Sequence, residues 1–203
     1  MMIAYVMILV SFISGALPFS VWLTRIVLGK DVRHFGDGNP GAANVFRTGK
    51  YFLGLMTLLL DVSKAAAPVG FAYNNLQIRG ITMVFIAVAP VIGHMFSPFL
   101  AFKGGKAIAT VLGVWIGLTL WMASLPAVIA AVIGSVFLTS SGWSVMLAMI
   151  AILITLLLCF PTPLLLSIWA ALTFLLAWTH RTQLRQLPRL RSWLTKFRAR
   201  SNN

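Results

Sequence analysis

Long apolar stretches separated by short polar segments are the feature that most constrains this fold. Residues 2–24, 51–73 and 80–100 are almost free of charge, and each is long enough to cross a bilayer as a helix, which takes roughly 20 residues. The stretches 107–138 and 143–179 are too long for one crossing, and each contains a break, near 121–126 and 159–163. With 60% hydrophobic and 9% charged residues, the chain is predicted to be an all-α, polytopic membrane protein.

The positive charges predict how the chain is oriented. With both breaks counted there are about seven transmembrane helices, and one side of the membrane receives the segments 25–50, 101–106, 139–142 and 180–203. Of the sixteen Lys and Arg residues, five, two and seven lie in the first, second and fourth of these segments. Positive residues favour the cytoplasmic side, so the N-terminus is predicted outside and the C-terminus in the cytoplasm. Five helices keep the same parity and stay an alternative.

The domain organisation predicted from this pattern is simple. Residues 1–180 form a single transmembrane domain, and 181–203 form a basic cytoplasmic tail that can lie as an amphipathic segment on an anionic membrane. No positive residue precedes the first apolar stretch, which is therefore expected to be a retained span and not a cleaved signal.

Charge and composition narrow the partners. A net charge of +13 calls for anionic partners, but basic residues in short loops between apolar spans favour membrane lipid over nucleic acid. The single Cys159 excludes a disulfide framework. Three Asp and three His are scattered without ligand spacing, so no metal and no other cofactor is expected.

The first candidate site is the segment HFGDGNPGAANVFRTGK, residues 34–50. Its glycines permit backbone angles that are closed to other residues, so that successive N–H groups can converge on an anion. Arg47 then supplies a guanidinium suited to two-pronged contact with phosphate. The alternative is an ordinary loop between two spans.

The second candidate is GHMFSPFLAFKGGKAIAT, residues 93–110. Gly104 and Gly105 lie between Lys103 and Lys106, just before a new apolar stretch begins. Two cations, free backbone N–H groups and a helix N-terminus would then surround one spot, which predicts a phosphate cradle. His94, at the cytoplasmic end of the third span, is close enough in sequence to take part.

Three further features carry polar groups at or inside the spans. Asp61 and Lys64 are spaced i, i+3 on one helical face, where a charged pair either fastens helices together or serves function. His180 and Arg181 close the last apolar stretch, and Ser141 lies in the polar segment TSSGWS. The serine is either a phosphate donor or part of a turn.

Together and in this order, these motifs resemble one family. The stretches DVRHFGDGNPGAANVFRTGK, LLLDVSKAAAPV, GHMFSPFLAFKGGKAIATVLGV and, more weakly, THRTQLRQL are similar to the bacterial acyl-phosphate:glycerol-3-phosphate acyltransferases. The resemblance covers almost the full length. It implies an enzyme of phospholipid synthesis in the bacterial inner membrane, whose site faces the cytoplasm and needs no cofactor.

The reaction implied by the resemblance joins two phosphorylated partners. An acyl group passes from acyl phosphate to the 1-hydroxyl of glycerol 3-phosphate, which gives lysophosphatidic acid and inorganic phosphate. The catalytic groups implied are His94, Lys103, Arg47 and His180. The implied phosphate contacts are Asp37, Gly38, Asn39, Gly41, Asn44, Arg47, Lys64, Lys103, Gly104, Gly105, Lys106, Ser141 and Gln183.

Several positions depart from the family pattern and keep other functions open. Asp37 stands where the family usually has Ser, and it could weaken phosphate binding, act as a base or pair with Arg33 or Arg47. Met95 stands where the family has an amide, Gln183 replaces an Asn by an amide one methylene longer, and no basic residue directly precedes the TSSGWS segment. The alternatives are a catalytically weakened paralogue that binds phospholipid or glycerol phosphate, and a small transporter of organic anions.

Overall fold

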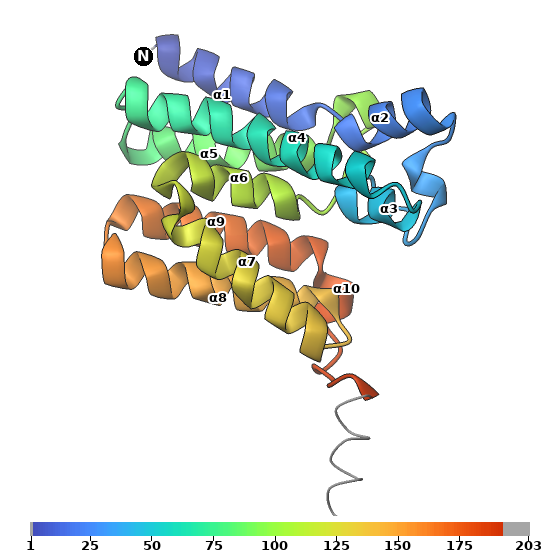
Figure 1. The fold of residues 1–203 in the computed structure, drawn as a ribbon. Coiled ribbons are helices and arrows are strands. Elements are labelled where there is room, and N and C mark those ends of the chain that lie inside the picture. Colours follow the sequence, from blue (N-terminus) through green and yellow to red (C-terminus); the bar gives the residue numbers. More distant parts are fainter. Residues whose placement is uncertain (1, 193–203) are drawn as a thin grey trace, which may run out of the picture. The chain divides into compact units, whose positions relative to one another are not determined.

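The computed structural model describes residues 2–192, and within that range the chain is almost entirely helical. Its elements are α1 (Met2–Ala16), α2 (Phe19–Leu28), η1 (Val32–His34), α3 (Ala42–Arg47), α4 (Tyr51–Gly70), η2 (Phe71–Asn75), α5 (Gly80–Met95), η3 (Pro98–Leu100), α6 (Ile108–Thr119), α7 (Trp121–Phe137), α8 (Ser141–Cys159), α9 (Pro163–Thr179) and α10 (Arg181–Leu184) (Figure 1). They form two compact units, unit 1 up to Leu120 and unit 2 from Trp121 onward. Each unit is described by itself.

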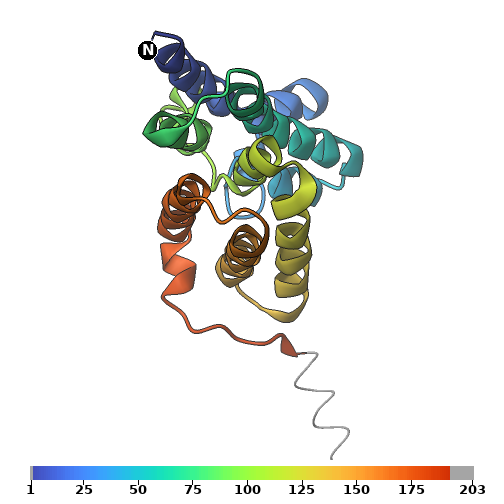
Figure 2. The same ribbon diagram turned by 90° about the vertical axis from the view of Figure 1, so that its left-hand side faces the viewer.

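Unit 1 is built on α1, α4, α5 and α6, which lie side by side in two perpendicular views (Figures 1 and 2). Glycines allow the backbones to approach closely, as is typical of helices packed without large side chains between them. A Cβ atom on Gly113 of α6 would overlap the carbonyl oxygen of Val62 in α4. In the same way, a Cβ atom on Gly15 of α1 would overlap the backbone of Pro90 in α5.

The two loops singled out in the sequence lie at the same end of unit 1. α1 runs toward this end and stops at Ala16, where Leu17 and Pro18 separate it from the shorter α2 (Figure 1). α4 and α6 begin here and α5 ends here. Segments 25–50 and 101–106 were predicted to share one side of the membrane, and they do lie at one end of this unit, whereas the break inside the first apolar stretch was not predicted.

Unit 2 contains α7, α8, α9 and α10. The predicted break between α6 and α7 lies at Leu120, whose φ of 53° no longer fits a right-handed helix, and Pro126 lies inside α7. The second predicted break is confirmed, because α8 ends at Cys159 and α9 begins at Pro163. An isolated bridge between Leu138 and Leu190 ties the segment after α7 to the segment after α10, so these two polar segments share one end of unit 2, as predicted.

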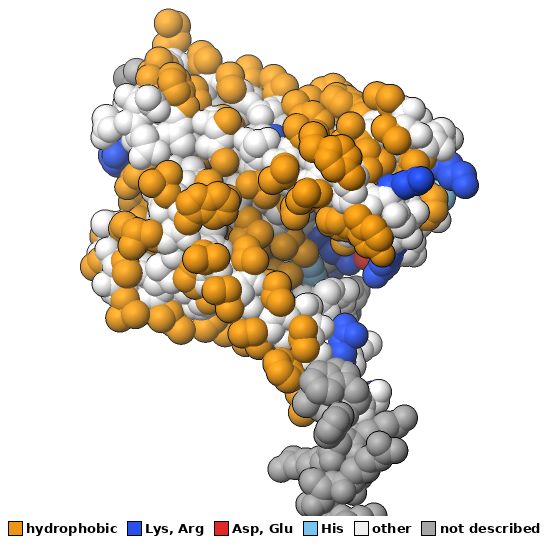
Figure 3. Space-filling model, viewed as in Figure 1, with side chains coloured by type: hydrophobic (Ala, Val, Ile, Leu, Met, Phe, Trp, Pro, Cys, Tyr) orange, Lys and Arg blue, Asp and Glu red, His pale blue; other side chains and the backbone are white. Residues whose placement is uncertain are grey.

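The helices have the length and surface of membrane-spanning segments. Within residues 2–192, four helical stretches are long and apolar enough to cross a bilayer, Met2–Leu28, Tyr51–Asn75, Gly80–Leu100 and Ser141–Cys159. Three apolar helices, α6, α7 and α9, are shorter. Hydrophobic side chains cover much of the visible surface, and a group of Lys and Arg lies at the end of unit 1 that carries α2 and α3 (Figure 3).

The all-α class is thereby confirmed, and so are helices suited to a membrane. The number of seven helices, the orientation of the termini and the division at residue 180 stay predictions. The predicted amphipathic tail falls largely on residues 193–203, which lie outside the described residues.

Candidate active site

The first loop of unit 1 is held in shape by the side chains of its own polar residues. The Asp37 carboxylate accepts hydrogen bonds from the backbone N–H of Asn39 at 3.3 Å and from Nδ2 of Asn44 at 2.9 Å. Nδ2 of Asn44 also donates to the carbonyl of Asn39 at 3.0 Å, and Asn44 is buried. An Asp side chain that binds the N–H two residues on is a common turn device. Gly36, Gly38 and Pro40 complete this turn before α3 begins.

Two contacts then join the first loop to the second. The backbone N–H of Lys106 donates to Oδ1 of Asn39 at 3.1 Å, and Nζ of Lys106 lies 2.8 Å from Oδ2 of Asp37. An ion pair of Asp37 with Arg33 or Arg47 was one of the roles left open by the sequence, and this alternative is wrong. Arg33 pairs with Asp31 instead, and Arg47 donates to Oδ1 of Asn44.

These contacts keep both carboxylates of the loop ionised. Partial burial would raise the pKa of Asp37, but hydrogen bonds from Lys106 and Asn44 outweigh it and lower that pKa to about 2. The Arg33 guanidinium holds the pKa of Asp31 far below its usual range. A carboxylate with so low a pKa is a weak base, which counts against Asp37 as a proton acceptor in catalysis.

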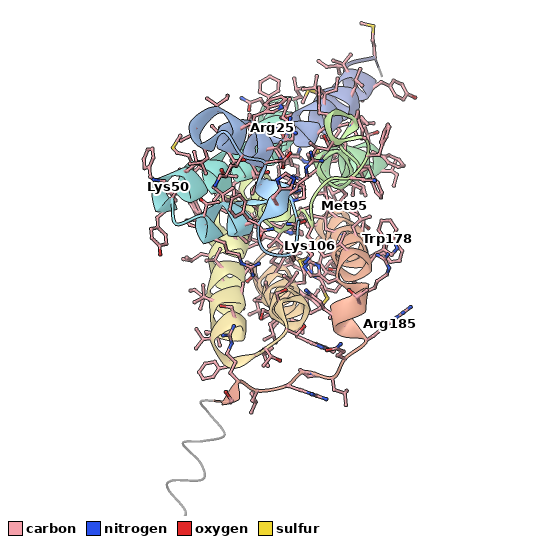
Figure 4. All side chains as sticks on the ribbon, turned by 90° about the vertical axis from the view of Figure 1, so that its right-hand side faces the viewer. Arg25, Lys50, Met95, Lys106, Trp178 and Arg185 are labelled. Atoms are coloured by element: carbon pink, nitrogen blue, oxygen red, sulfur yellow. The ribbon has the colours of Figure 1, made fainter. Side chains whose placement is uncertain are left out.

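The second loop contains the glycine–lysine loop, residues 103–106, which is not the open cradle that its sequence suggests. The N–H of Gly104 donates to the carbonyl of Met95 and that of Gly105 to the carbonyl of His94, both at 3.0 Å. The expectation that these N–H groups are free is wrong. A Cβ atom on Gly104 would overlap the His94 carbonyl oxygen, and one on Gly105 would overlap the His94 ring. The two glycines are needed because this loop packs directly on the end of α5; Figure 4 looks onto this end of the unit, with Met95 and Lys106 labelled.

The N–H groups of the first loop are engaged in the same way. Gly38 donates to the carbonyl of Phe35 and Gly41 to that of Asn39. Free backbone N–H groups of these glycines therefore do not form the predicted anion site, and its candidate donors are the side chains and the N-terminus of α6.

Beneath the two loops lies a buried charged cluster that joins three segments of unit 1. Nζ of Lys64 donates to Oδ1 of Asp61 at 2.7 Å, to Nδ1 of His94 at 2.8 Å and to the carbonyl of Leu17 at 2.9 Å. The side chains of Asp61 and Lys64 are only 3% and 2% exposed. All three ammonium hydrogens are used inside the protein, which favours the fastening role of Lys64 over contact with a substrate.

The cluster also orients the histidine. An ammonium group can only donate, so Nδ1 of His94 must accept, and the ring hydrogen of the neutral imidazole lies on Nε2. Gly105 lies against this Nε2 edge of the ring. His94 therefore offers a fixed N–H donor at the side of the ring that faces the second loop.

A cavity of about 190 Å³ opens where these elements meet. Its polar lining comes from Asn39, Asp61, His94 and Lys106, and Lys106 is the one Lys or Arg of the described residues that borders it. The rest of the lining is mainly apolar, from Gly41, Ala42, Ala43, Leu58, Ala107, Ile108, Ala109 and Leu112. A ligand that carries both an anionic group and an apolar chain would match this mixed lining.

The remaining predicted residues lie in two places. Lys103 and Arg47 are exposed at the same end of unit 1. Ser141, His180 and Gln183 lie together in unit 2, where Oγ of Ser141 donates to Oε1 of Gln183 at 3.0 Å and Nδ1 of His180 bonds the carbonyl of Leu176 at 2.9 Å. That these three residues share a substrate site with the loops stays a prediction. No group of three potential metal ligands occurs among residues 2–192.

Sequence comparison finds similarity along nearly the whole chain. The model of the family described as glycerol-3-phosphate acyltransferase matches residues 5–189. A glycerol-3-phosphate acyltransferase of Rhodopseudomonas palustris (strain HaA2) is 37% identical over 197 residues, covering 89% of each chain. The chain belongs to the glycerol-3-phosphate acyltransferase family. The predicted family is thus confirmed.

Other members of the glycerol-3-phosphate acyltransferase family match over different lengths. Glycerol-3-phosphate acyltransferase 1 of Thermotoga maritima is 40% identical over 122 residues, and this match spans 60% of that protein. Two crystal structures of PlsY (YgiH), an integral membrane glycerol 3-phosphate acyltransferase, share the fold at 25% identity. Its glycerol 3-phosphate form gives a TM-score of 0.82 over 96% of this chain and 98% of that one, and its lysophosphatidic acid form gives 0.80 over 91% of each.

Some residues of the candidate site could not be predicted from the sequence. The i, i+3 spacing indicated the contact of Asp61 with Lys64, but nothing in the sequence placed His94 or the Leu17 carbonyl beside them. The apolar cavity residues, such as Leu58 and Leu112, look like any other residues of a span. Asp37 was noticed as unusual, yet its partner Lys106 is 69 positions away along the chain.

Proposed function

We propose that this protein transfers an acyl group from acyl phosphate to the 1-hydroxyl of glycerol 3-phosphate. The observation that supports this best is the cavity whose polar lining comes from Asn39, Asp61, His94 and Lys106 and whose remaining lining is mainly aliphatic. Such a cavity suits an acyl chain that ends in a phosphate group. The relatives named glycerol-3-phosphate acyltransferase, and the solved structure with glycerol 3-phosphate, support the acceptor.

The reaction requires little beyond positioning and charge. The glycerol 1-hydroxyl oxygen forms a bond to the acyl carbonyl carbon, the bond from that carbon to the phosphate oxygen breaks, and the hydroxyl proton is released to phosphate or water. Phosphate is a good leaving group, so the main task is to hold two anions close together. Lys106, the exposed Lys103 and Arg47, and the N-terminus of α6 would offset that repulsion. The fixed Nε2–H of His94 would donate to a phosphate or carbonyl oxygen.

The site would face the cytoplasm of a bacterial cell, with about seven helices crossing the inner membrane. The support is the unequal distribution of Lys and Arg along the chain. Glycerol 3-phosphate is charged and arrives from water, and the phosphate end of the acyl donor is charged as well, which a cytoplasmic opening allows. His180, Ser141 and Gln183 would complete the site as polar groups, in keeping with the resemblance noted in the sequence.

The test is acyl transfer by purified protein in detergent, with acyl phosphate and labelled glycerol 3-phosphate as substrates and acyl-CoA as the parallel donor. Lysophosphatidic acid formed from acyl phosphate alone is expected. Arg47→Ala and Lys103→Ala should lose turnover while the protein stays folded, whereas Lys50→Ala, an exposed lysine in the same loop, should not. Product from acyl-CoA alone would contradict the proposed donor.

A binding paralogue without turnover is the second candidate. It is favoured by the carboxylate of Asp37, which neutralises Lys106 at the edge of the cavity. A folded protein that binds glycerol 3-phosphate and yields no product from either donor would establish this function instead.

A further inference from the structure

The contact between Asp37 and Lys106 places a carboxylate where an anionic ligand would be expected. Nζ of Lys106 is 2.8 Å from Oδ2 of Asp37, and Lys106 is the cation that borders the cavity in the described part of the chain. A phosphate oxygen that sought the same ammonium would meet Asp37 already bound to it. The chain thus carries its own competitor for this position.

The two partners differ in how firmly they are held. Oδ1 of Asp37 is fixed by the backbone N–H of Asn39 and by Nδ2 of Asn44, and Asn44 is itself only 2% exposed. Lys106 has a long flexible side chain that is 26% exposed, and within residues 2–192 its Nζ bonds one side chain, that of Asp37. The lysine can therefore leave while the carboxylate stays, and a half-exposed pair costs little to separate.

Charge then decides which ligands can replace the carboxylate. A monoanion offers Lys106 no more charge than Asp37 already does, and it must also approach a fixed negative group. A dianionic phosphate group is attracted about twice as strongly by the ammonium at a given distance and is also repelled about twice as strongly by Asp37. With the ammonium as the nearer group, the net gain grows with the charge of the ligand, whereas the cost of opening the ion pair is the same for every anion. Every anion must displace the Asp37 carboxylate from Lys106, and only a dianion gains enough from the ammonium to do so. Specificity would then come from this unfavourable step.

Given the proposed function, on which this inference rests, we propose that Asp37 is a specificity-determining residue of the acceptor and product site. Its carboxylate holds Lys106 in the unliganded protein and yields it only to a dianionic phosphate group. The binding of every phosphate ligand is weakened in return, including the inorganic phosphate that the reaction releases. Asp37 thus relieves product inhibition at the expense of a higher KM for glycerol 3-phosphate.

The test compares Asp37→Asn with the wild-type protein by equilibrium binding of inorganic phosphate near neutral pH, with acetate as the monoanionic probe. Asn keeps an oxygen for the Asn39 N–H and removes the charge. Asp37→Asn should bind phosphate about fivefold more tightly, a change typical of one exposed ion pair, and acetate should now compete. Asp31→Asn is the matched control, because Asp31 lies in the same segment between α2 and α3 and its ion pairs within residues 2–192 are with Arg25 and Arg33; it should bind as the wild type does.

Equal or weaker phosphate binding by Asp37→Asn would overturn the proposal, as would no measurable binding to either protein. Asp37→Ser provides a second variant that keeps a short polar acceptor if Asp37→Asn does not fold. Because the binding test needs no turnover, a tighter Asp37→Asn in a protein that forms no product would contradict the proposed function alone.

Kinetics separate this role from a merely structural one. In Asp37→Asn, the KM for glycerol 3-phosphate and the inhibition constant for phosphate should fall together, with kcat nearly unchanged. A fall in kcat at constant or higher KM would mean that Asp37 only positions the two loops, and would contradict the proposal.

Discussion

Unit 1 contains two Asp–Lys ion pairs of nearly equal length in very different surroundings. Asp61 and Lys64 are 2.7 Å apart and almost fully buried, whereas Asp37 and Lys106 are 2.8 Å apart with 50% and 26% of their side chains exposed. The buried pair lies within one helix and is completed by His94 and a backbone carbonyl. The exposed pair joins two loops that are far apart in the sequence.

The surroundings decide what each pair can do. A buried ion pair cannot be opened cheaply, because each charge would remain in a medium that solvates it poorly. An exposed pair exchanges its partner for water or for another ion at a cost of about 1 kcal/mol or less. The first pair therefore belongs to the framework that fixes His94, and the second can respond to a ligand.

Lys64→Met should have the largest effect on folding. It leaves the Asp61 carboxylate buried without its ammonium partner, which costs about 3–5 kcal/mol of unfolding free energy. Thermal or denaturant unfolding of the purified protein in micelles would measure it. The double variant Asp61→Asn/Lys64→Met leaves no buried charge and should recover part of the loss; a single variant as stable as the wild type would show that the pair is not a fastener.

Asn44→Ala should come next, because Asn44 connects the exposed pair to the rest of the first loop. Its buried amide bonds Asp37, the Asn39 carbonyl and Arg47, and leaving such partners unsatisfied costs about 1–3 kcal/mol. The variant should unfold at a lower temperature or denaturant concentration, and its rate of acyl transfer should be lower. Asn75→Ala, at an exposed site at the other end of unit 1, is the control. An equal loss of stability there would show that the hydrogen bonds of Asn44 do not stabilise the protein more than an exposed amide does.

Lys106→Met applies the same substitution to the exposed pair and should give the opposite result. The unfolding free energy should change by less than about 1 kcal/mol, while the KM for glycerol 3-phosphate should rise at least about tenfold, which corresponds to about 1.4 kcal/mol of binding. Steady-state kinetics and unfolding of the same preparation measure both. Lys50→Met, which replaces an exposed lysine of the first loop at the same end of unit 1, should change neither value. A large loss of stability in Lys106→Met would remove the distinction between the two pairs.

The two pairs also show how far sequence can predict this molecule. The helical class and the Asp61–Lys64 contact follow from local patterns, about 20 apolar residues for a span and a spacing of i, i+3 for the pair, which a single chain displays directly. The shared end of the two loops follows from the order of these spans along the chain. The approach of His94 to Lys64, and of Lys106 to Asp37, depends on how α4, α5 and α6 pack, and no local pattern encodes that.

The glycine–lysine loop is a second example of what local sequence patterns cannot predict. Its glycines signalled a special backbone correctly, but the sequence could not tell an open anion cradle from close packing on α5. The break at Leu17 and Pro18 was likewise hidden, because the apolar run continues on both sides of it.

The pH dependence of Asp37 is the smallest effect expected from the comparison. Its pKa is lowered from 3.8 to about 2 in the folded protein, so its contacts stabilise the fold fully above the unfolded value and are lost as the pH falls through the folded one. Because the side chain is half exposed, the contribution should stay below about 1 kcal/mol. Unfolding of the wild type and Asp37→Asn should therefore differ slightly at pH of about 6, and the difference should shrink below a pH of about 4. A difference that grows as the solution becomes more acidic would mean that the loops bind the neutral form of Asp37. Asp37 and Lys106 would then not form an ion pair that can be compared with Asp61 and Lys64.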